Sequence, residues 1–381
     1  MIKLISNVFP AIKQSIGLRY TLNLKMKHWW TGRKFCVGVL SSAVFLTLAL
    51  QQVDWARTAA TLRDANWVLA SLGIGAAVAT LVTFAFRWRV LLSSTAELPV
   101  KDTFSYIMIG HLANTVFPLR MGEVAKAVLL GKRHQISASL VFGSVVLERT
   151  LDVLTILMLA LGVSLIMDIP PAVRAGMMTL AGAGLVALGA LLFLARSGNR
   201  VLGWVGRLSG FAPGSLPERL AMLVERFAGG LGTLRDGRQL GLVLCLSMLA
   251  WAIAGTATIS YIAAFQLHAP WYAGFFVLTV TNLGSAIPSS PGFIGVYHYL
   301  AVLALSVWVP DKSEALGYAI GTHGITMLTN ILIGCTCLAR EGIALQSIGA
   351  MGHVVQETIV SQKEDGKSVF LPQPSPSDGS P

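Results

Sequence analysis

The sequence predicts an all-α integral membrane protein, and its composition carries that prediction. Of the 381 residues, 54% are hydrophobic and only 12% are charged, which is about half the charged fraction of a soluble globular domain. The mean hydropathy of the chain is +0.67. A chain with so little polar surface cannot solvate a large folded particle, so we expect most of it to contact lipid.

Long apolar runs recur along the chain, and several approach or exceed the roughly 20 residues that cross a bilayer. They cover residues 35–50, 67–86, 150–167, 175–195, 240–267 and 315–339. Each run predicts a spanning helix, and the third helix extends back to residue 137. The sequence therefore predicts about six spanning helices.

Positive charge gathers beside these runs and accounts for the formal net charge of +11. Residues 1–34 contain Lys and Arg but no acidic residue, and residues 196–239 contain seven Arg against three acidic residues, Glu218, Glu225 and Asp236. Basic flanks of spanning helices stay in the cytoplasm and attract anionic lipid. We therefore expect both chain ends and the Arg-rich linker on the cytoplasmic side of a bacterial inner membrane. No nucleic-acid-binding module accompanies the charge, so nucleic acid is not an expected partner.

The runs and the charges divide the chain into three parts. A basic N-terminus (1–34) precedes a transmembrane domain (35–340), and a polar tail (341–381) with a composition typical of disorder follows it. The domain has a first half (35–195), the cytoplasmic linker (196–239) and a second half (240–340). Within the linker, residues 216–234 mix charged and apolar side chains at helical spacing, which predicts a surface helix.

One further apolar segment in each half is interrupted at its centre. The run 104–130 contains Pro118, Arg120 and Gly122, and basic residues lie before and after it. Entry and exit on the cytoplasmic side predict a re-entrant hairpin of two half-length helices. Broken backbone at membrane depth is tolerated where it is buried in protein or lines a cavity.

The run 271–309 is broken by Pro288, Pro291, Gly292 and Gly295, in the half of opposite orientation. Interrupted segments at corresponding positions of two inverted halves are typical of inverted-repeat transporters, which bind substrate at the broken helices. Six spanning helices plus two re-entrant hairpins is our prediction. Eight ordinary spanning helices is the alternative.

Three groups of residues are candidates for a substrate-binding site. The first comprises Asn114, Pro118, Arg120, Gly122, Glu123 and Lys126. A half-helix N-terminus carries partial positive charge, and a guanidinium suits bidentate contact with phosphate. Glu123 is a candidate partner for Arg120 when no ligand is bound. The competing interpretation is an interfacial Arg–Glu pair that anchors the loop.

The second group comprises Glu148, Arg149 and Asp152. On a helix, Glu148 and Asp152 share a face, and Arg149 lies next to Asp152. We expect these residues to pair with Arg120 or Lys126 inside the bundle. A purely structural set of ion pairs is the alternative interpretation.

The third group surrounds the break in the second half and offers amide, hydroxyl and backbone groups but no fixed charge. It comprises Asn282, Pro288, Ser289, Ser290, Pro291, Gly292, Gly295 and His298. Such a loop could contact a polar headgroup or form a gate, and a tight external turn is the alternative. His323, in the last apolar run, is interpreted as a packed helix residue rather than a proton carrier.

Signatures of catalysis and of cofactors are missing from the sequence. It has no P-loop, no H-E-x-x-H and no G-x-S-x-G motif. The four cysteines, Cys36, Cys245, Cys335 and Cys337, have no His at zinc-site spacing. We therefore predict neither an enzyme nor a bound metal or cofactor.

At these three groups the sequence resembles the lysylphosphatidylglycerol synthase transmembrane-region family, also described as flippase-like. The matching residues run from Asn114 to Glu123, from Glu148 to Asp152 and from Ile287 to Val296. The resemblance covers roughly residues 35 to 340. It implies a prokaryotic inner-membrane protein that moves or handles phospholipids, hopanoids or lipid-linked sugars.

The sequence departs from that family pattern in two ways. A soluble domain that transfers lysine to lipid follows the membrane region in some members, whereas only a short polar tail follows Arg340 here. We therefore expect no aminoacylation of lipid. The family often has a carboxylate after the Gly-Val of the third motif, where this chain has Tyr297 and His298.

The leading functional hypothesis is flippase-like translocation of an anionic phospholipid, a hopanoid or a lipid-linked phosphate. An accessory or catalytic membrane subunit of lipid glycosylation, working with a lipid-synthesis enzyme, is the strongest alternative. A scaffold that recruits a partner through the Arg-rich linker is a third.

Overall fold

The computed structural model describes residues 33–117, 120–166, 171–208, 224–285 and 287–345. Within these ranges all regular secondary structure is helical. The prediction of an all-α membrane protein is therefore confirmed. The basic N-terminus up to residue 32, the linker residues 209–223 and the tail from residue 346 lie outside the described ranges.

The first half of the chain forms seven helices. They are α3 (Arg33–Leu50), α4 (Trp55–Arg63), α5 (Trp67–Leu92), α6 (Val100–Val116), α7 (Met121–His134), α8 (Ala138–Val163) and α9 (Pro171–Leu208). Side-chain caps define several of their starts. Asn66, for example, accepts hydrogen bonds from the backbone N–H groups of Val68 and Leu69 at the start of α5.

The described end of the linker forms a short 3₁₀ turn, and the described residues after it form four helices and a second 3₁₀ turn. In chain order these are η3 (Gly232–Arg235), α11 (Gly237–Ala264), α12 (Ala273–Gly284), η4 (Pro291–Phe293), α13 (Val296–Leu305) and α14 (Lys312–Glu341). The breaks between α6 and α7 and between α12 and α13 fall where Pro and Gly predict them.

Four described helices are long and apolar enough to cross a membrane: α5, residues 175–197 of α9, α11 and α14. α3 and α4 meet at a bend of 91° and together provide at most a fifth span. α8 has 26 residues, but Glu148, Arg149 and Asp152 interrupt its apolar sequence. The predicted number of six spanning helices is therefore not confirmed by length and composition.

The helices beside the two breaks are short. α6 has 17 residues, α7 has 14, α12 has 12 and α13 has 10. Each is shorter than the roughly 20 residues that a span requires. These lengths agree with the predicted hairpins.

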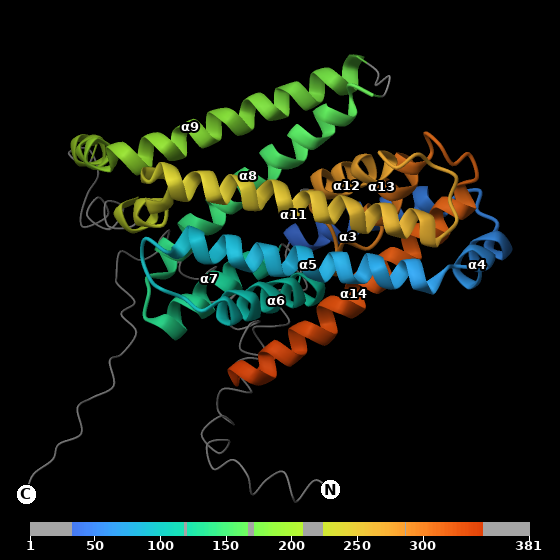
Figure 1. Cartoon of the computed structure of the whole chain (residues 1–381), viewed down its shortest axis with the longest axis horizontal. Helices are drawn as coiled ribbons and strands as arrows, with labels where there is room; N and C mark the ends of the chain where they lie inside the picture. Colours follow the sequence, from blue (N-terminus) through green and yellow to red (C-terminus); the bar gives the residue numbers. More distant parts are fainter. Residues whose placement is uncertain (1–32, 118–119, 167–170, 209–223, 286, 346–381) are drawn as a thin grey trace, which may run out of the picture.

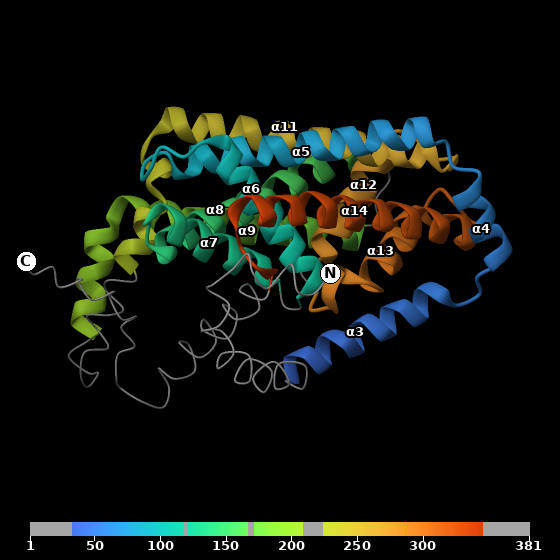
Figure 2. The ribbon, with the colours of Figure 1, turned by 90° about the horizontal axis from the view of Figure 1, so that it is seen from below.

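α5 and α11 lie side by side along the long axis of the bundle (Figures 1 and 2). Their close approach depends on Gly73, because a Cβ there would lie 2.7 Å from Cδ1 of Tyr261. α6 and α7 lie towards one end of this pair, and α12 and α13 lie towards the other (Figure 1). Each end has its own apolar core, and the candidate site lies between them.

The described end of the Arg-rich linker is helical over residues 224–229, with Glu225 and Arg226 exposed, and is largely buried over residues 230–234. Leu231 and Leu234 are fully buried, and a Cβ on Gly230 would overlap the carbonyl oxygen of Leu140. Thr233 Oγ1 donates a hydrogen bond to the carbonyl oxygen of Leu91 at 2.9 Å. The structure therefore agrees with the predicted surface helix over residues 224–229 and differs from it over residues 230–234, which form a turn whose apolar residues close the end of the bundle.

Candidate functional site

A cavity of about 380 Å³ lies inside the bundle, between the two helix breaks. Its walls come from eight helices of both halves: α5, α6, α7, α8, α11, α12, α13 and α14. Arg120 and Glu123 face it from the first break, and Gly292 and Phe293 face it from the second. The tertiary fold therefore brings two segments together that are about 170 residues apart in the sequence.

Two glycines hold the first hairpin closed beside this cavity. A Cβ on Gly122 would overlap the carbonyl oxygen of Gly110 and lie 2.6 Å from Asn114 Oδ1. The N–H of Gly122 donates a hydrogen bond to that same Oδ1 atom at 2.8 Å. α6 and the start of α7 thus touch backbone to backbone, and Asn114 binds one of the unpaired N–H groups of a helix N-terminus.

Arg120 occupies the N-cap position of α7 in a left-handed conformation, with φ of 54°. Its guanidinium donates a hydrogen bond to Ser285 Oγ and lies 5.5 Å from the centre of the Phe293 ring. Both partners belong to the second half. Arg120 forms no ion pair with any described carboxylate, so the predicted Arg120–Glu123 pair is wrong.

The predicted charged residues of α7 and α8 do form one buried network. Lys126 Nζ lies 3.0 Å from Glu148 Oε2 and 3.0 Å from Glu123 Oε2. Its ammonium also lies 5.0 Å from the centre of the Trp88 ring, a cation–π contact. The predicted pairing of α8 carboxylates with Lys126 is therefore confirmed, whereas their pairing with Arg120 is wrong.

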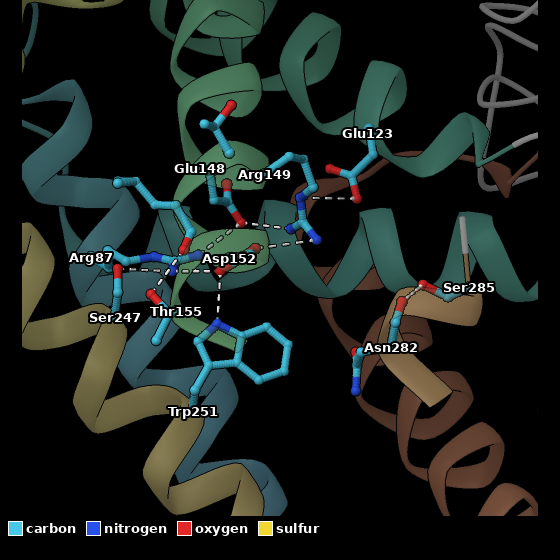
Figure 3. Close-up of polar contacts among 12 residues, drawn as sticks. Arg87, Glu123, Glu148, Arg149, Asp152, Thr155, Ser247, Trp251, Asn282 and Ser285 are labelled. Carbon is cyan, nitrogen blue, oxygen red and sulfur yellow. Dashed lines mark hydrogen bonds and ion pairs between the residues drawn. The ribbon is translucent and has the colours of Figure 1, made fainter. Parts of the chain in front are cut away.

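Arg149 reaches from α8 towards the cavity and contacts all three carboxylates (Figure 3). Its guanidinium donates a hydrogen bond to Glu148 Oε1 at 2.7 Å. It also lies 3.8 Å from Glu123 and 3.4 Å from Asp152. Glu123 is therefore paired with Lys126 and Arg149, which explains why it does not form an ion pair with Arg120.

Arg87, a residue that the sequence analysis did not select as a candidate, completes the network. Arg87 of α5 is fully buried, and its Nη1 donates hydrogen bonds to Asp152 Oδ1 at 2.6 Å and to Ser247 Oγ at 3.1 Å (Figure 3). Trp251 Nε1 donates to the same carboxylate oxygen at 2.9 Å. α5 and α11 are thereby tied to α8. The length of α5 was the available signal for Arg87. Because Arg87 lies more than one turn before the end of this helix, it is not a terminal charge.

The charges of this region do not cancel. The cations are Arg87, Arg120, Lys126 and Arg149, and the carboxylates are Glu123, Glu148 and Asp152. With neutral histidines one positive charge is in excess. Since three of the cations pair with the three carboxylates, the uncompensated charge is that of Arg120.

The second break is arranged differently from its prediction. Ser289, Ser290 and Gly295 pack against α3: Ser42 Oγ accepts a hydrogen bond from the N–H of Ser290 at 2.8 Å, and a Cβ on Gly38 would lie 2.8 Å from the carbonyl oxygen of Ser289. These residues do not line the cavity. The cavity side of the break is formed instead by Asn282, Ser285, Gly292 and Phe293.

An uncharged polar cluster lies deeper in the second half. The hydroxyl groups of Tyr297 and Thr322 lie 3.1 Å apart, and the ring of His323 lies 4.7 Å from that of Tyr297 and 4.8 Å from that of His298. Tyr297, Thr322 and His323 line the cavity. His323 is buried and packed against other rings, in agreement with its interpretation as a packed helix residue.

The predicted site residues thus fall into three sets. Those that line the cavity are Asn114, Arg120, Glu123, Arg149, Asn282 and Gly292. Those that lie behind its wall are Gly122, Lys126, Glu148, Asp152, Pro288, Ser289, Ser290, Pro291, Gly295 and His298. Pro118 lies outside the described residues. Cavity residues that the sequence analysis missed include His111, Tyr261, Ser285, Thr326 and Asn330.

The part of the chain that the structure describes contains no group of three or more His, Cys, Asp or Glu side chains arranged to hold a metal ion. The three carboxylates of the network are instead neutralised by Arg and Lys side chains.

Comparisons with known proteins place this chain among membrane proteins. It is 25% identical over 367 residues to the protein named Glycosyltransferase AglD of Haloferax volcanii, and the match covers 84% of this chain and 58% of that relative. It is 23% identical over 228 residues to a UPF0104 membrane protein of Methanocaldococcus jannaschii, with 58% of this chain and 90% of that relative covered. No solved structure matches the chain significantly.

The match to a protein family is more extensive. The lysylphosphatidylglycerol synthase TM region matches residues 35–334, which include both broken segments and the whole charged network. This chain is a multi-pass membrane protein that belongs to the lysylphosphatidylglycerol synthase transmembrane-region family.

Proposed function

We propose that this protein moves a phosphate-bearing lipid across the membrane in the manner of a flippase. The observation that carries the proposal is the setting of Arg120, a guanidinium without a carboxylate partner at the wall of an internal cavity. A partly buried guanidinium beside the N-terminus of a helix favours phosphate, because both supply donors and positive potential.

The proposed topology has six spanning helices and two re-entrant hairpins. α3, α5, α8, α9, α11 and α14 are the spans, and the short pairs α6/α7 and α12/α13 are the hairpins. Both chain ends then lie in the cytoplasm of a bacterial cell, and the hairpins approach the cavity from opposite sides. Broken helices at a cavity between inverted halves are typical of transporters.

Labelling of single cysteines tests this topology. In a cysteine-free background, a cysteine at position 132 after α7 should react with a membrane-impermeant reagent from the cytoplasmic side. Reaction from the outside alone would contradict the re-entrant first hairpin and favour eight ordinary spans.

In the proposed cycle the lipid phosphate replaces Ser285 as the partner of Arg120. The Arg120–Ser285 hydrogen bond joins the first hairpin to the turn after α12. Its replacement by a phosphate would release one hairpin from the other and allow them to move separately. The network behind Arg120 would keep the remaining cations paired with carboxylates during that movement.

Transport of a fluorescent phosphate-bearing lipid in proteoliposomes tests the function. Arg120→Ala removes a charge-assisted interaction worth about 1.5–3 kcal/mol, so we expect transport to fall roughly 10- to 100-fold. Arg120→Lys keeps the charge and should retain part of the activity. The control is Arg63→Ala, because Arg63 is exposed and pairs with Asp64 alone. Equal rates for wild type and Arg120→Ala would refute the proposal.

A membrane subunit of lipid glycosylation is the second candidate. It is supported by the relative named as a glycosyltransferase, of whose length this chain spans 58%. In this function the cavity would hold a lipid-linked sugar next to a partner enzyme instead of moving it. Formation of a glycosylated lipid by purified protein with a sugar donor, without any transport in proteoliposomes, would favour this candidate.

A further inference from the structure

The walls of the cavity carry many uncharged polar groups, and these restrict the headgroup that fits beside Arg120. α14 contributes a stripe at helical spacing: Thr322, Thr326, Thr329 and Asn330 all line the cavity. α12 and its C-terminal turn contribute Thr281, Asn282 and Ser285. Most of the cavity wall is apolar, but these polar side chains, which would be costly in lipid, face the cavity and offer a ligand hydrogen bonds.

Several of these groups have hydrogen-bonding capacity to spare. The three Thr hydroxyls of the α14 stripe donate to carbonyl oxygens of their own helix. The oxygens of Thr326 and Thr329 remain available as acceptors, whereas Thr322 Oγ1 already lies 3.1 Å from the hydroxyl of Tyr297. The amide of Asn330 and the hydroxyl of Tyr261 have no hydrogen-bond partner among the described residues, and neither does the amide nitrogen of Asn114. Donors and acceptors are therefore both available to a ligand.

The charged groups of the wall restrict the ligand further. Glu123 is the one described carboxylate that lines the cavity, and it already pairs with Lys126 and Arg149. A headgroup ammonium would therefore meet no unpaired carboxylate, and a buried unpaired charge is strongly unfavourable. A ligand with one negative charge neutralises the excess charge of Arg120, whereas a phosphate monoester, with a charge near −2, would exceed it.

The cavity volume agrees with a headgroup. About 380 Å³ lies at the lower end of the range for small-molecule sites. This space suits a phosphate and a small polar group, and the lipid chains would remain outside it.

We infer that the cavity selects a phosphodiester lipid that carries a single negative charge and an uncharged, hydroxyl-rich headgroup. Its phosphate binds at Arg120, and its hydroxyls bind along α12 and α14. This inference rests on the proposed function and specifies its substrate class. Two sources supply such chemistry: a glycerophospholipid with a polyol head and a polyprenyl phosphate that carries a sugar.

Native mass spectrometry of the purified full-length protein in nanodiscs of phosphatidylcholine, each containing one probe lipid, tests the inference. The probes are phosphatidylglycerol, phosphatidylethanolamine, phosphatidic acid, a polyprenyl phosphate and a polyprenyl glucosyl phosphate. We expect at least one hydroxyl-rich phosphodiester to be retained about 10-fold more than the probes that lack hydroxyls. Whether phosphatidylglycerol or the polyprenyl glucosyl phosphate is retained identifies which of the two lipid sources the protein binds. Preference for phosphatidylethanolamine or for the phosphate monoesters would overturn the inference.

Variants test recognition of the headgroup separately from recognition of the phosphate. Asn330→Ala should lower the preference for the hydroxyl-rich probe over its monoester counterpart by about fivefold, the value of one neutral hydrogen bond. Retention of the monoester should not change, since Arg120 is intact. The matched control is Thr336→Val, because Thr336 lies on the same helix, is exposed and does not line the cavity. Equal preferences in wild type and Asn330→Ala would also overturn the inference.

Arg120→Ala distinguishes this failure from failure of the proposed function. If Arg120→Ala loses every phosphate-bearing probe while wild type shows no preference for hydroxyls, the phosphate site stands and the inference about the head fails. If Arg120→Ala retains all probes as wild type does, both fail.

Discussion

The two halves of the cavity are built from different chemistry. The first half contributes the buried ions of α5, α7 and α8, where Arg87, Lys126 and Arg149 neutralise three carboxylates. The second half contributes hydroxyl, amide and imidazole groups, and its described cavity wall carries no formal charge. The first half therefore fixes the electrostatic potential of the cavity, and the second half supplies neutral hydrogen bonds.

The same difference affects stability. A buried ion pair that loses one member leaves an uncompensated charge. A neutral pair that loses one hydroxyl leaves at most one unsatisfied group. Substitutions in the first half should therefore cost more than comparable substitutions in the second half.

The largest effect is expected for Asp152→Ala. Asp152 accepts hydrogen bonds from Arg87 and Trp251, and Arg87 is fully buried. Its removal should lower the free energy of unfolding by about 3–5 kcal/mol. Thermal unfolding of the purified protein in detergent measures this change. Arg87 Nη2 also lies 3.4 Å from Glu148 Oε1, so an unfolding temperature equal to that of wild type would show that Glu148 alone compensates the charge of Arg87, and the comparison of the two halves would fail.

Gly122→Ala should have the next largest effect. The added Cβ would overlap the backbone of Gly110 and disturb the Asn114 hydrogen bond. Overpacking of this kind costs about 1–3 kcal/mol, so the unfolding temperature should fall. The control is Gly182→Ala, since a Cβ at Gly182 meets no atom within 4 Å. Equal destabilisation by both changes would mean that the first hairpin does not depend on close backbone contact.

Tyr297→Phe tests the neutral half. The variant loses the hydrogen bond between the hydroxyl groups of Tyr297 and Thr322, but Thr322 still donates to the carbonyl oxygen of Tyr318. We expect a loss of about 1 kcal/mol in the free energy of unfolding. Tyr299→Phe is the control, because the Tyr299 hydroxyl forms no hydrogen bond with a described residue. A loss as large as that of Asp152→Ala would contradict the proposed difference between the halves.

The smallest effect is expected at the exposed end of the bundle. Arg57 Nη1 lies 2.6 Å from Asp311 Oδ2, outside the membrane-spanning helices, and the hydrogen bond from Arg57 lowers the pKa of Asp311. A carboxylate with a lowered pKa stabilises the fold above its unfolded pKa, near 3.8, and this contribution is lost as the pH falls through the lower folded value.

Arg57→Ala should therefore lower the unfolding temperature slightly and equally at pH 6 and pH 7. The difference from wild type should disappear well below pH 4. Exposed pairs contribute little, so a shift as large as that of Gly122→Ala would show that this contact does more than join α4 to the start of α14. A difference that grew on acidification would contradict the assignment of the pair.

The sequence by itself determined the membrane class, the helical fold and the positions of both broken segments. These features depend on composition and on local backbone chemistry, since apolar length selects spanning helices and Pro and Gly interrupt them. The sequence also identified Arg120 and the charged residues of α7 and α8 as candidates. It did so because charge within an apolar run is costly wherever it occurs.

The tertiary structure decided which of these residues contact one another. Periodicity places Glu148 and Asp152 on one face of a helix, but it does not show that Arg87 lies opposite them or that Glu123 pairs with Lys126 and Arg149 instead of Arg120. Arg87 and Asp152 are 65 residues apart in the chain, and Glu123 and Arg149 lie on different helices, so only the packing of α5, α7 and α8 brings these side chains together. The role of the polar stripe of α14 also depends on the tertiary structure, because only the packing of the bundle orients that face towards a cavity and not towards lipid.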